Sequence, residues 1–256
     1  MHILVKAFIK AYWKTLLFFG VVGLVGGYTV GMYQLVSYPA EVLQELYAQD
    51  LNDTFVGLVT AVQSAGYGLV LGALGIWLGK KVGLWKGECS IAKQPLLAAL
   101  IIGAVGGLGL ILPDLLFFGK HEPALLDAYA VKPTILYLLA TVTYGAVIEE
   151  VVLRLFMMSL VAFVLHLIFE RKRETVSTGV LVAANVLAAL LFAAGHLPAN
   201  EMMFGLTPVI VFRCMLLNGG FGLAFGWLYR RFGLRYAMIA HGGCHVVSKL
   251  IWILFI

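Results

Sequence analysis

The chain has 256 residues, of which 62% are hydrophobic and only 12% are charged, and its formal net charge is +5. Because a soluble domain carries about 25% charged residues, this composition excludes a soluble domain of useful size. It predicts an all-α, polytopic integral membrane protein. The basic residues cluster in short segments between apolar runs, as membrane topology requires, so the positive charge does not indicate a nucleic-acid partner.

Apolar runs long enough to cross a bilayer, which takes about 20 residues, follow one another along the chain. They lie at 13–36, 54–79, 95–118, 133–169, 178–197, 207–229 and 236–256. The run 133–169 is too long for one straight crossing at ~1.5 Å per residue. We expect seven spans if this run is one tilted helix that projects from the membrane, and eight if it is broken.

The segments between the spans alternate in charge. Residues 1–14, the segment 80–93, the loop Arg171-Lys172-Arg173 and the segment 230–235 are basic, whereas 37–53 and 198–206 contain no Lys or Arg. By the positive-inside rule, seven spans place the N-terminus in the cytoplasm and the C-terminus outside. We expect a multi-pass protein of the cell membrane.

The first three spans, within residues 1–132, are rich in glycine and carry almost no intramembrane charge. Glycine lets membrane helices approach closely, so packing explains it and we assign no chemistry to this region. Every unusual polar group falls in the last four spans, which makes residues 133–256 the predicted catalytic core. The chain has three cysteines, an odd number with no CxxC spacing, which does not favour a disulfide framework or a zinc knuckle; they are Cys89, Cys214 and Cys244.

One stretch in the run 133–169 brings ionisable groups into the membrane. It reads Glu149-Glu150-Val151-Val152-Leu153-Arg154. Each such group costs roughly 2.5–3.5 kcal/mol at the centre of a membrane helix, so it is by default a functional residue. On a helix Glu150 and Arg154 lie at i and i+4 and form a pair, whereas Glu149 is rotated by about 100° and finds no partner there. We expect one structural and one free carboxylate; an ion-pair cluster that only ties helices together is the alternative.

Three histidines lie in the same group of spans. His196 ends the predicted fifth span, and His241 and His245 share one face of the last helix at i and i+4. A carboxylate in apolar surroundings is a stronger base than in water, and imidazoles can stabilise an oxyanion, which together make a hydrolase arrangement. Glutamate and histidine are also good zinc ligands. Cys244 offers a nucleophile as an alternative, but its neighbouring histidines do not project squarely onto it.

These residues resemble a family. Glu149-Glu150-(x)3-Arg154 is similar to an EExxxR motif, Phe192-(x)3-His196 to FxxxH, and the segment from Gly226 to His241 to the approach to HxxxN. Three motifs in this order, each in an apolar span, are typical of the CPBP family of intramembrane proteases, the CAAX-protease and bacteriocin-processing group. The resemblance covers roughly residues 133–250.

The resemblance implies a role for each residue. Glu149 activates the attacking water with His196, His241 stabilises the oxyanion, and Glu150 and Arg154 form the supporting pair. For this family both a metal-dependent and a metal-free, glutamate-based mechanism are considered. If a divalent metal such as zinc is bound, its candidate ligands are Glu149, His196, His241 and His245. This chain departs from the family at His245, which stands where the family has Asn or Asp, and at Leu153 and Leu155, where the family commonly has an aromatic residue and a glycine.

The predicted spans conflict with a single site. His196 ends one span and His241 lies near the start of another, so the span between them should hold the two side chains ~20 Å apart. One site requires the fifth span to start later, to continue past His196, or to tilt strongly. Since the motifs point to one site, we expect the span boundary at residue 197 to be wrong.

The sequence therefore predicts an intramembrane endopeptidase that uses a Glu/His-activated water, with or without a metal, to cut a peptide or protein substrate at the membrane. Two other hypotheses remain. A proton-coupled transporter would distribute polar groups along a path and often has pseudo-symmetric halves. A non-catalytic scaffold or immunity protein on the same fold would not depend on Glu149.

Overall fold

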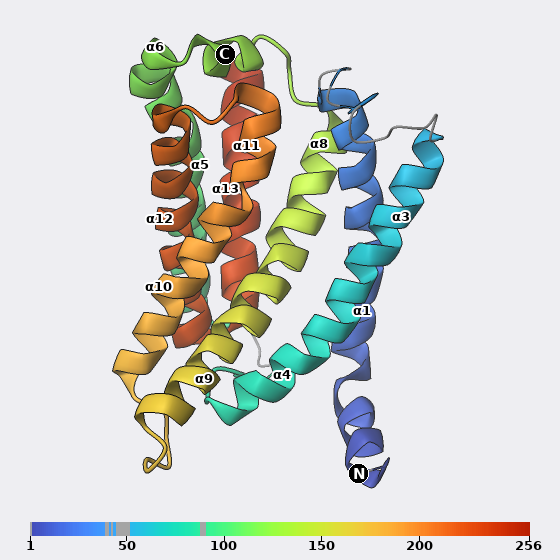
Figure 1. Ribbon diagram of the computed structural model, residues 1–256, viewed down its shortest axis with the longest axis vertical. Helices are drawn as coiled ribbons and strands as arrows, with labels where there is room; N and C mark the ends of the chain where they lie inside the picture. The colour runs from blue at the N-terminus through green and yellow to red at the C-terminus, as the bar shows by residue number, and fades with distance from the viewer. Residues whose placement is uncertain (1, 39–40, 42, 45–51, 88–90) are drawn as a thin grey trace.

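A computed structural model describes residues 2–38, 41, 43–44, 52–87 and 91–256. These residues are helical apart from short connections, and seven of their helical segments are long and apolar enough to cross a membrane. The prediction of an all-α protein with seven spans is confirmed. Cys89, Glu45 and Asp50 lie outside the described residues. The two ends of the chain lie at opposite ends of the molecule (Figure 1).

The first three spans are built from consecutive helical segments. The first is α1 (His2–Ser37); the second joins α3 (Asp53–Gly66), the π-helical η1 (Tyr67–Leu71) and α4 (Gly72–Lys81); the third joins α5 (Lys93–Pro113), η2 (Asp114–Phe118) and α6 (Gly119–His121). A short helix, α7 (Pro123–Tyr129), precedes the fourth span.

The fourth span is one unbroken, tilted rod. It joins α8 (Ile135–Ala140), η3 (Thr141–Glu149), η4 (Val151–Met158) and α9 (Ser159–Phe169). At ~1.5 Å per residue its 35 residues are longer than a bilayer core, and the rod runs diagonally through the molecule (Figure 1). The tilted alternative for the run 133–169 is therefore the one observed, and no eighth span arises among the described residues.

The last three spans pack against this rod. They are α10 (Thr178–Gly195) continued by α11 (Leu197–Phe204), then α12 (Pro208–Phe232), then α13 (Leu234–Phe255). Side-chain hydroxyls cap the N-termini of two of these helices. Those of Ser177 and Thr207 accept hydrogen bonds from backbone N–H groups in the first turns of α10 and α12. Gly233 connects α12 to α13 at φ +106°, a conformation that favours glycine, so that α13 turns back directly along α12.

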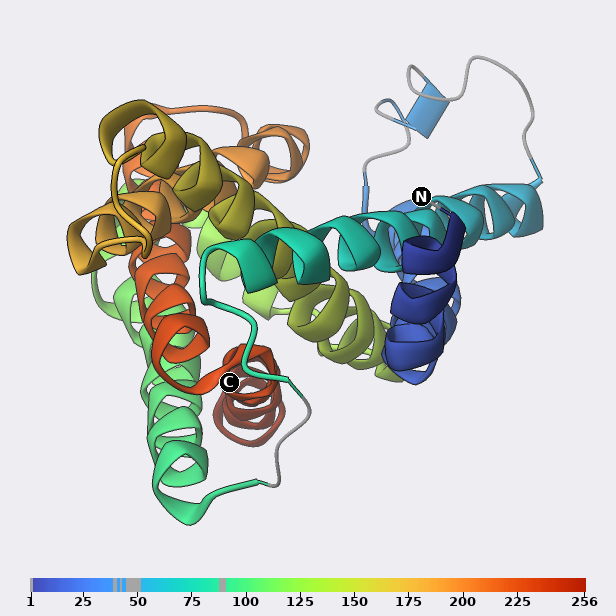
Figure 2. The same cartoon turned by 90° about the horizontal axis from the view of Figure 1, so that it is seen from below.

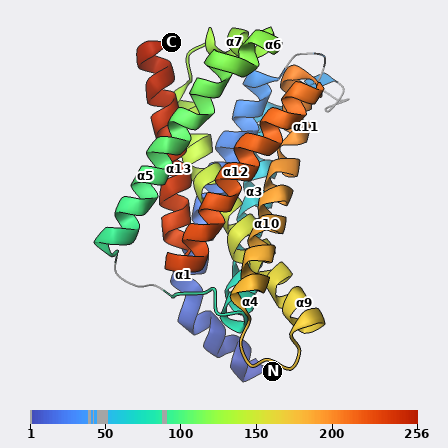
Figure 3. The ribbon, with the colours of Figure 1, turned by 90° about the vertical axis from the view of Figure 1, so that its left-hand side faces the viewer.

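The N-terminal helices pack against the fourth span as well as against one another. A Cβ on Gly26 of α1 would lie 2.7 Å from the Tyr144 backbone nitrogen, and a Cβ on Gly75 of α4 would lie 2.7 Å from Leu155 Cγ. Glycine at these two positions permits the close approach that the sequence analysis predicted. Figures 1 and 3 show α1 and α3 on one side of the rod and α5, α12 and α13 on the other. The predicted functional division at residue 132 stays a prediction.

The third span carries one buried charge, in a region where the sequence analysis expected almost none. Asp114 is 1% exposed and receives two hydrogen bonds from Arg213 of α12, with Nε to Oδ1 at 2.5 Å and Nη2 to Oδ2 at 2.6 Å. The hydroxyl of Tyr129 donates a third at 2.9 Å. This bidentate geometry is the strong form of a charge pair, and it links the first three spans to the last four.

The fifth span continues past His196, which resolves the conflict between the predicted spans. The backbone N–H and the side-chain amide of Asn200 both donate to the His196 carbonyl, at 3.1 and 2.7 Å, so α11 prolongs α10 as far as Phe204. The predicted boundary at residue 197 is wrong. His196 lies eight residues, or about 12 Å, inside the span Thr178–Phe204. Its Nε2 atom and that of His241 both lie 4.0 Å from Glu149 Oε2.

Candidate active site

Glu150 and Arg154 form the buried pair that the sequence analysis predicted. Arg154 Nη1 lies 3.2 Å from Glu150 Oε1, and the two side chains are 1% and 0% exposed. The backbone around them is π-helical in η3 and η4, a conformation that is rare and frequent at functional sites. Because neither group reaches water, each depends on the other for its charge.

Two phenylalanines hold the guanidinium of Arg154 in place. Its carbon lies 4.3 Å from the ring centre of Phe192 and 5.5 Å from that of Phe225, so both rings make cation–π contacts with it. Phe192 also contacts the His196 ring edge-on at 4.7 Å, and Phe225 stacks on His241 at 4.8 Å. The supporting pair and the histidines are therefore packed as one unit.

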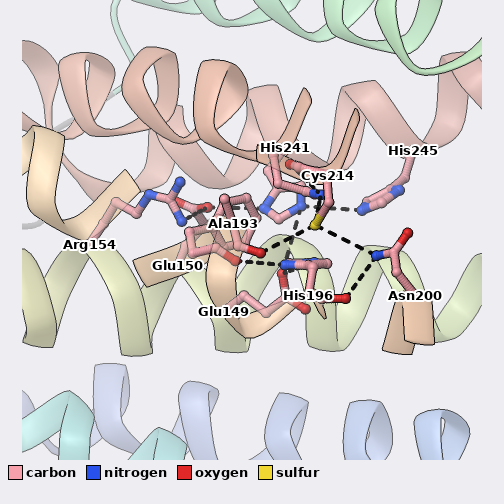
Figure 4. Close-up of polar contacts among 11 residues, drawn as sticks. Glu149, Glu150, Arg154, Ala193, His196, Asn200, Cys214, His241 and His245 are labelled. Carbon is pink, nitrogen blue, oxygen red and sulfur yellow. Dashed lines mark hydrogen bonds and ion pairs between the residues drawn. The ribbon is translucent and has the colours of Figure 1, made fainter. Parts of the chain in front are cut away.

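Glu149 points toward two histidines and makes no pair with Arg154. Its Oε2 lies 4.0 Å from Nε2 of His196 and 4.0 Å from Nε2 of His241. Its side chain is 22% exposed, whereas that of Glu150 is completely buried. The two adjacent carboxylates thus occupy different environments, as the sequence analysis predicted (Figure 4).

His196 is oriented by the backbone of its own helix. Its Nδ1 lies 2.8 Å from the Phe192 carbonyl oxygen, and since a carbonyl only accepts, Nδ1 carries the proton. In the neutral ring Nε2 then has a free lone pair, and this atom faces Glu149. The spacing FxxxH supplies both the carbonyl and the ring that fix the imidazole.

His241 and His245 meet through their Nε2 atoms. His241 Nδ1 lies 3.0 Å from Glu150 Oε1, and its Nε2 lies 3.2 Å from Nε2 of His245. With Nδ1–H donated to the carboxylate of Glu150, the neutral His241 ring accepts at Nε2 from His245. The His at the third-motif position that the family fills with Asn or Asp therefore makes a hydrogen bond to His241.

Gly145 leaves the room that the two histidines need. A Cβ at this position would lie 3.3 Å from His245 Nε2 and 3.9 Å from His241 Nε2. We expect Gly145→Ala to displace His245 by a few tenths of an ångström and to lower turnover about tenfold, because small misplacements in an active site are costly. The measurement is the cleavage rate beside the unfolding temperature. Gly220→Ala in α12 is the control, since a Cβ there has no neighbour within 4 Å. Equal rates for both variants would contradict this role.

A cavity of about 720 Å³ adjoins the site. His196 and Asn200 of the site line it, together with Tyr137 and Trp252. Residues of α7 and α11, which lie at the same end of the molecule (Figure 3), also contribute to the lining. Volumes of roughly 300–1,000 Å³ suit ligands the size of a short peptide or a drug. Asp114 and Arg213 also line this cavity. The buried ion pair that the sequence analysis did not predict is therefore part of the cavity wall.

The side chains present do not form a metal site as they are placed. Among the described residues, no group of three or more His, Cys, Asp or Glu side chains could hold a metal ion. The nitrogen that His241 directs toward the site lies in a hydrogen bond with His245, and the Glu149 carboxylate lies 4.0 Å from each of the two histidines that it faces. The four candidate zinc ligands are therefore neighbours, but in the structure they form a hydrogen bond and ion-pair contacts with one another.

The remaining polar residues of these spans lie apart from the site or support it. The thiol of Cys244 points to the Ile102 carbonyl of α5, away from Glu149, which removes the support for a cysteine nucleophile. Asn218 donates to the Cys214 carbonyl on its own helix. His166 pairs with Glu170 near the end of α9.

Sequence reasoning missed Phe225, Asn200 and Lys249. The ring of Phe225 carries no polar signal, and Asn200 stood in a predicted loop. Lys249 is a buried cation of α13, 4% exposed, with its Nζ 4.0 Å from the Tyr137 ring centre. A charge within an apolar span was the signal available for it.

Comparison with known proteins matches residues 131–247 to the family described as type II CAAX prenyl endopeptidase Rce1-like. This segment is a little under half of the chain, and it is similar to the CAAX-protease family that the three motifs resemble. No curated protein and no solved structure matches the chain. The resemblance to CPBP proteases is thus confirmed over this segment. The seven long apolar helices indicate a multi-pass integral membrane protein.

The matched segment contains the fourth, fifth and sixth spans and the part of the last span that carries both histidines. All three motifs of this CAAX-protease segment contribute to the cluster in Figure 4. The motif residues are far apart in the sequence, and only the packing of α10 and α13 against the tilted fourth span brings them together.

Proposed function

We propose that this protein hydrolyses a peptide bond of a membrane-associated substrate with a water activated by Glu149 and His196. The observation that carries this proposal is the 4.0 Å separation between Glu149 Oε2 and His196 Nε2. A single water hydrogen-bonds to both atoms at about 2.8 Å from each. Both of its hydrogens are then accepted, and a lone pair is left to attack a carbonyl carbon.

The reaction needs no acyl-enzyme. Glu149 takes one proton as the water oxygen forms a bond to the carbonyl carbon, and the carbonyl electron pair becomes the oxyanion. When the tetrahedral intermediate collapses, the C–N bond breaks and Glu149 returns the proton to the leaving amine. The products are a carboxylic acid and an amine, which ionise to a carboxylate and an ammonium ion, and one water is consumed.

His241 is the proposed oxyanion stabiliser. Its Nδ1–H is donated to Glu150 at 3.0 Å, so Nε2 donates to the oxyanion when the ring also carries a proton there. The carboxylates of Glu149 and Glu150 balance that charge. When Nε2 of His241 carries a proton, His245 either accepts a hydrogen bond from that nitrogen or leaves it free for the oxyanion. This assigns His245 a positioning role in place of the family's Asn or Asp.

The gathering of these groups favours a protease over the transporter hypothesis. Glu149, His196 and His241 converge on one point beside a cavity. A proton path would instead distribute its polar groups across the thickness of the membrane. The non-catalytic scaffold hypothesis is excluded if variants that lose cleavage activity also lose the physiological function.

The proposal is tested with the purified full chain in liposomes and a library of quenched-fluorescent peptides, with and without a lipid group on cysteine. We expect cleavage that continues in the presence of a zinc chelator, because Glu149 supplies the base. Cleavage that stops with the chelator and returns on addition of zinc would contradict the metal-free mechanism. Absence of cleavage of every peptide, with the protein folded, would contradict the protease proposal.

The position of the cavity restricts the class of substrate that can reach the site. Its lining includes residues of α7 and α11, and these helices lie at the end of the molecule opposite the N-terminus of α1 and the basic connections after α4 and α9 (Figure 3). If the basic end is cytoplasmic, as the positive-inside rule predicts, the substrate reaches the site from the outer face. A substrate anchored at that face then fits better than a prenylated tail in the cytoplasm.

Thiol labelling tests this orientation. In a chain with Cys89→Ser, we expect a membrane-impermeant maleimide to label Met203→Cys, which lines the cavity, in sealed cells. We expect Lys172→Cys, in the basic loop after α9, to be labelled only after permeabilisation. The reverse pattern would place the entrance in the cytoplasm and restore the cytoplasmic substrate.

A further inference from the structure

A second hollow lies at the basic end of the molecule, and it shares no lining residue with the cavity beside the proposed active site. Its volume is about 330 Å³, and its walls come from α1, from the connection that follows α4, and from the start of α13. Figure 2 looks onto this end and shows that connection passing the beginning of α13. Two hydrogen bonds join these walls: Ala92 N–H donates to the Tyr236 hydroxyl, and Arg235 Nη2 donates to the Gly87 carbonyl.

Three cations from three distant parts of the sequence line this hollow. They are Lys14, Lys86 and Arg235, and none of the described lining residues is acidic. Lys14 and Arg235 form no ion pair with any described residue, and Arg235 donates a hydrogen bond to the Gly87 carbonyl at 3.4 Å. The charge of the described lining residues is therefore positive, and an anion is the occupant complementary to them.

The rest of the wall is apolar and aromatic. Phe18, Trp85, Leu234 and Met238 line the hollow beside the cations, and Phe18 is 52% exposed on the outer surface of α1. An occupant here meets positive charge on one side and hydrocarbon on the other. This pairing fits an amphiphile and not a small soluble anion.

The hollow also lies at the depth of lipid headgroups. Lys14 precedes the end of α1 at Ser37 by 23 residues, or about 35 Å, while the hydrocarbon core of a bilayer is about 30 Å thick. A core that covers the apolar part of α1 leaves Lys14 at its edge. Trp85 occupies the interfacial position that tryptophan prefers.

We propose that this hollow binds the phosphate-containing headgroup of an anionic phospholipid. Basic pockets between membrane helices on the positively charged side have the chemistry for such headgroups. Lys14 and Arg235 contact the phosphate, and the acyl chains leave along Phe18. Because α13 carries His241 and His245, the bound lipid fastens the first helix to the helix of the proposed active site.

The experiment is a thermal-unfolding titration of the full chain in neutral detergent. The additives are phosphatidylglycerol, phosphatidylcholine and inorganic phosphate. We expect phosphatidylglycerol alone to raise the unfolding temperature. In Lys14→Gln/Arg235→Gln the concentration needed should rise at least about tenfold, because each cation near the membrane surface contributes to the affinity.

The control is Arg171→Gln/Lys172→Gln, which removes the same charge from a loop at the same end that does not line the hollow. We expect it to respond as the wild type does. The proposal is overturned if the control loses the response as strongly as the Lys14/Arg235 variant does. It is also overturned if that variant keeps the wild-type response, or if inorganic phosphate alone stabilises the protein as well as the lipid does. Because the readout is unfolding, the result does not depend on the proposed protease activity.

Discussion

Replacing Glu149 with glutamine is expected to abolish peptide cleavage while the protein remains folded. The amide has the size of the carboxylate but cannot take a proton from water, and loss of a general base typically costs 10²–10⁴-fold in rate. We expect a loss of about 10³-fold in kcat. Glu149 forms no ion pair closer than 4.0 Å and is 22% exposed, so its removal leaves the unfolding temperature nearly unchanged.

The matched control for this variant is Glu201→Gln. Glu201 is an exposed carboxylate of α11, in the span that carries His196, and it does not line the cavity. We expect wild-type cleavage from it. A Glu149→Gln protein that keeps a tenth or more of the wild-type rate would eliminate Glu149 as the base, whereas normal physiological function in an inactive variant would favour a scaffold.

Arg154→Met is expected to produce the largest loss of stability. The substitution leaves the fully buried carboxylate of Glu150 without its cation, and breaking a buried pair in this way costs about 3–5 kcal/mol. The rings of Phe192 and Phe225 lose their cation–π partner as well. We expect the unfolding temperature in detergent to fall by about 10 °C or more.

Two further variants separate the buried charge from other effects. Glu150→Gln/Arg154→Met removes both charges, so much of the lost stability should return. Arg173→Met removes a 66% exposed arginine that lies 3.9 Å from Glu170, and we expect it to change stability by less than about 1 kcal/mol. If Arg154→Met is no more harmful than Arg173→Met, Arg154 does not have the structural role assigned to it.

The sequence determined what depends on neighbours along the chain. Apolar runs longer than a bilayer predicted seven or eight spans, and the i, i+4 spacing of Glu150 and Arg154 predicted their pair, because both follow from the geometry of one helix. The same reasoning distinguished Glu149 from Glu150. The order of the three motifs identified the family, since a motif is itself a local pattern.

Tertiary structure decided what depends on how helices pack. The depth of His196 follows from the continuation of α10 into α11 and from the tilt that carries it to Glu149, and neither can be read from hydropathy. The Asp114–Arg213 pair joins residues 99 positions apart, so two isolated charges in the sequence gave no sign that they neutralise each other. Phe225 is one of many apolar residues until its ring stacks on His241. These contacts come from separate helices whose packing is selected by shape, and only the folded chain specifies it.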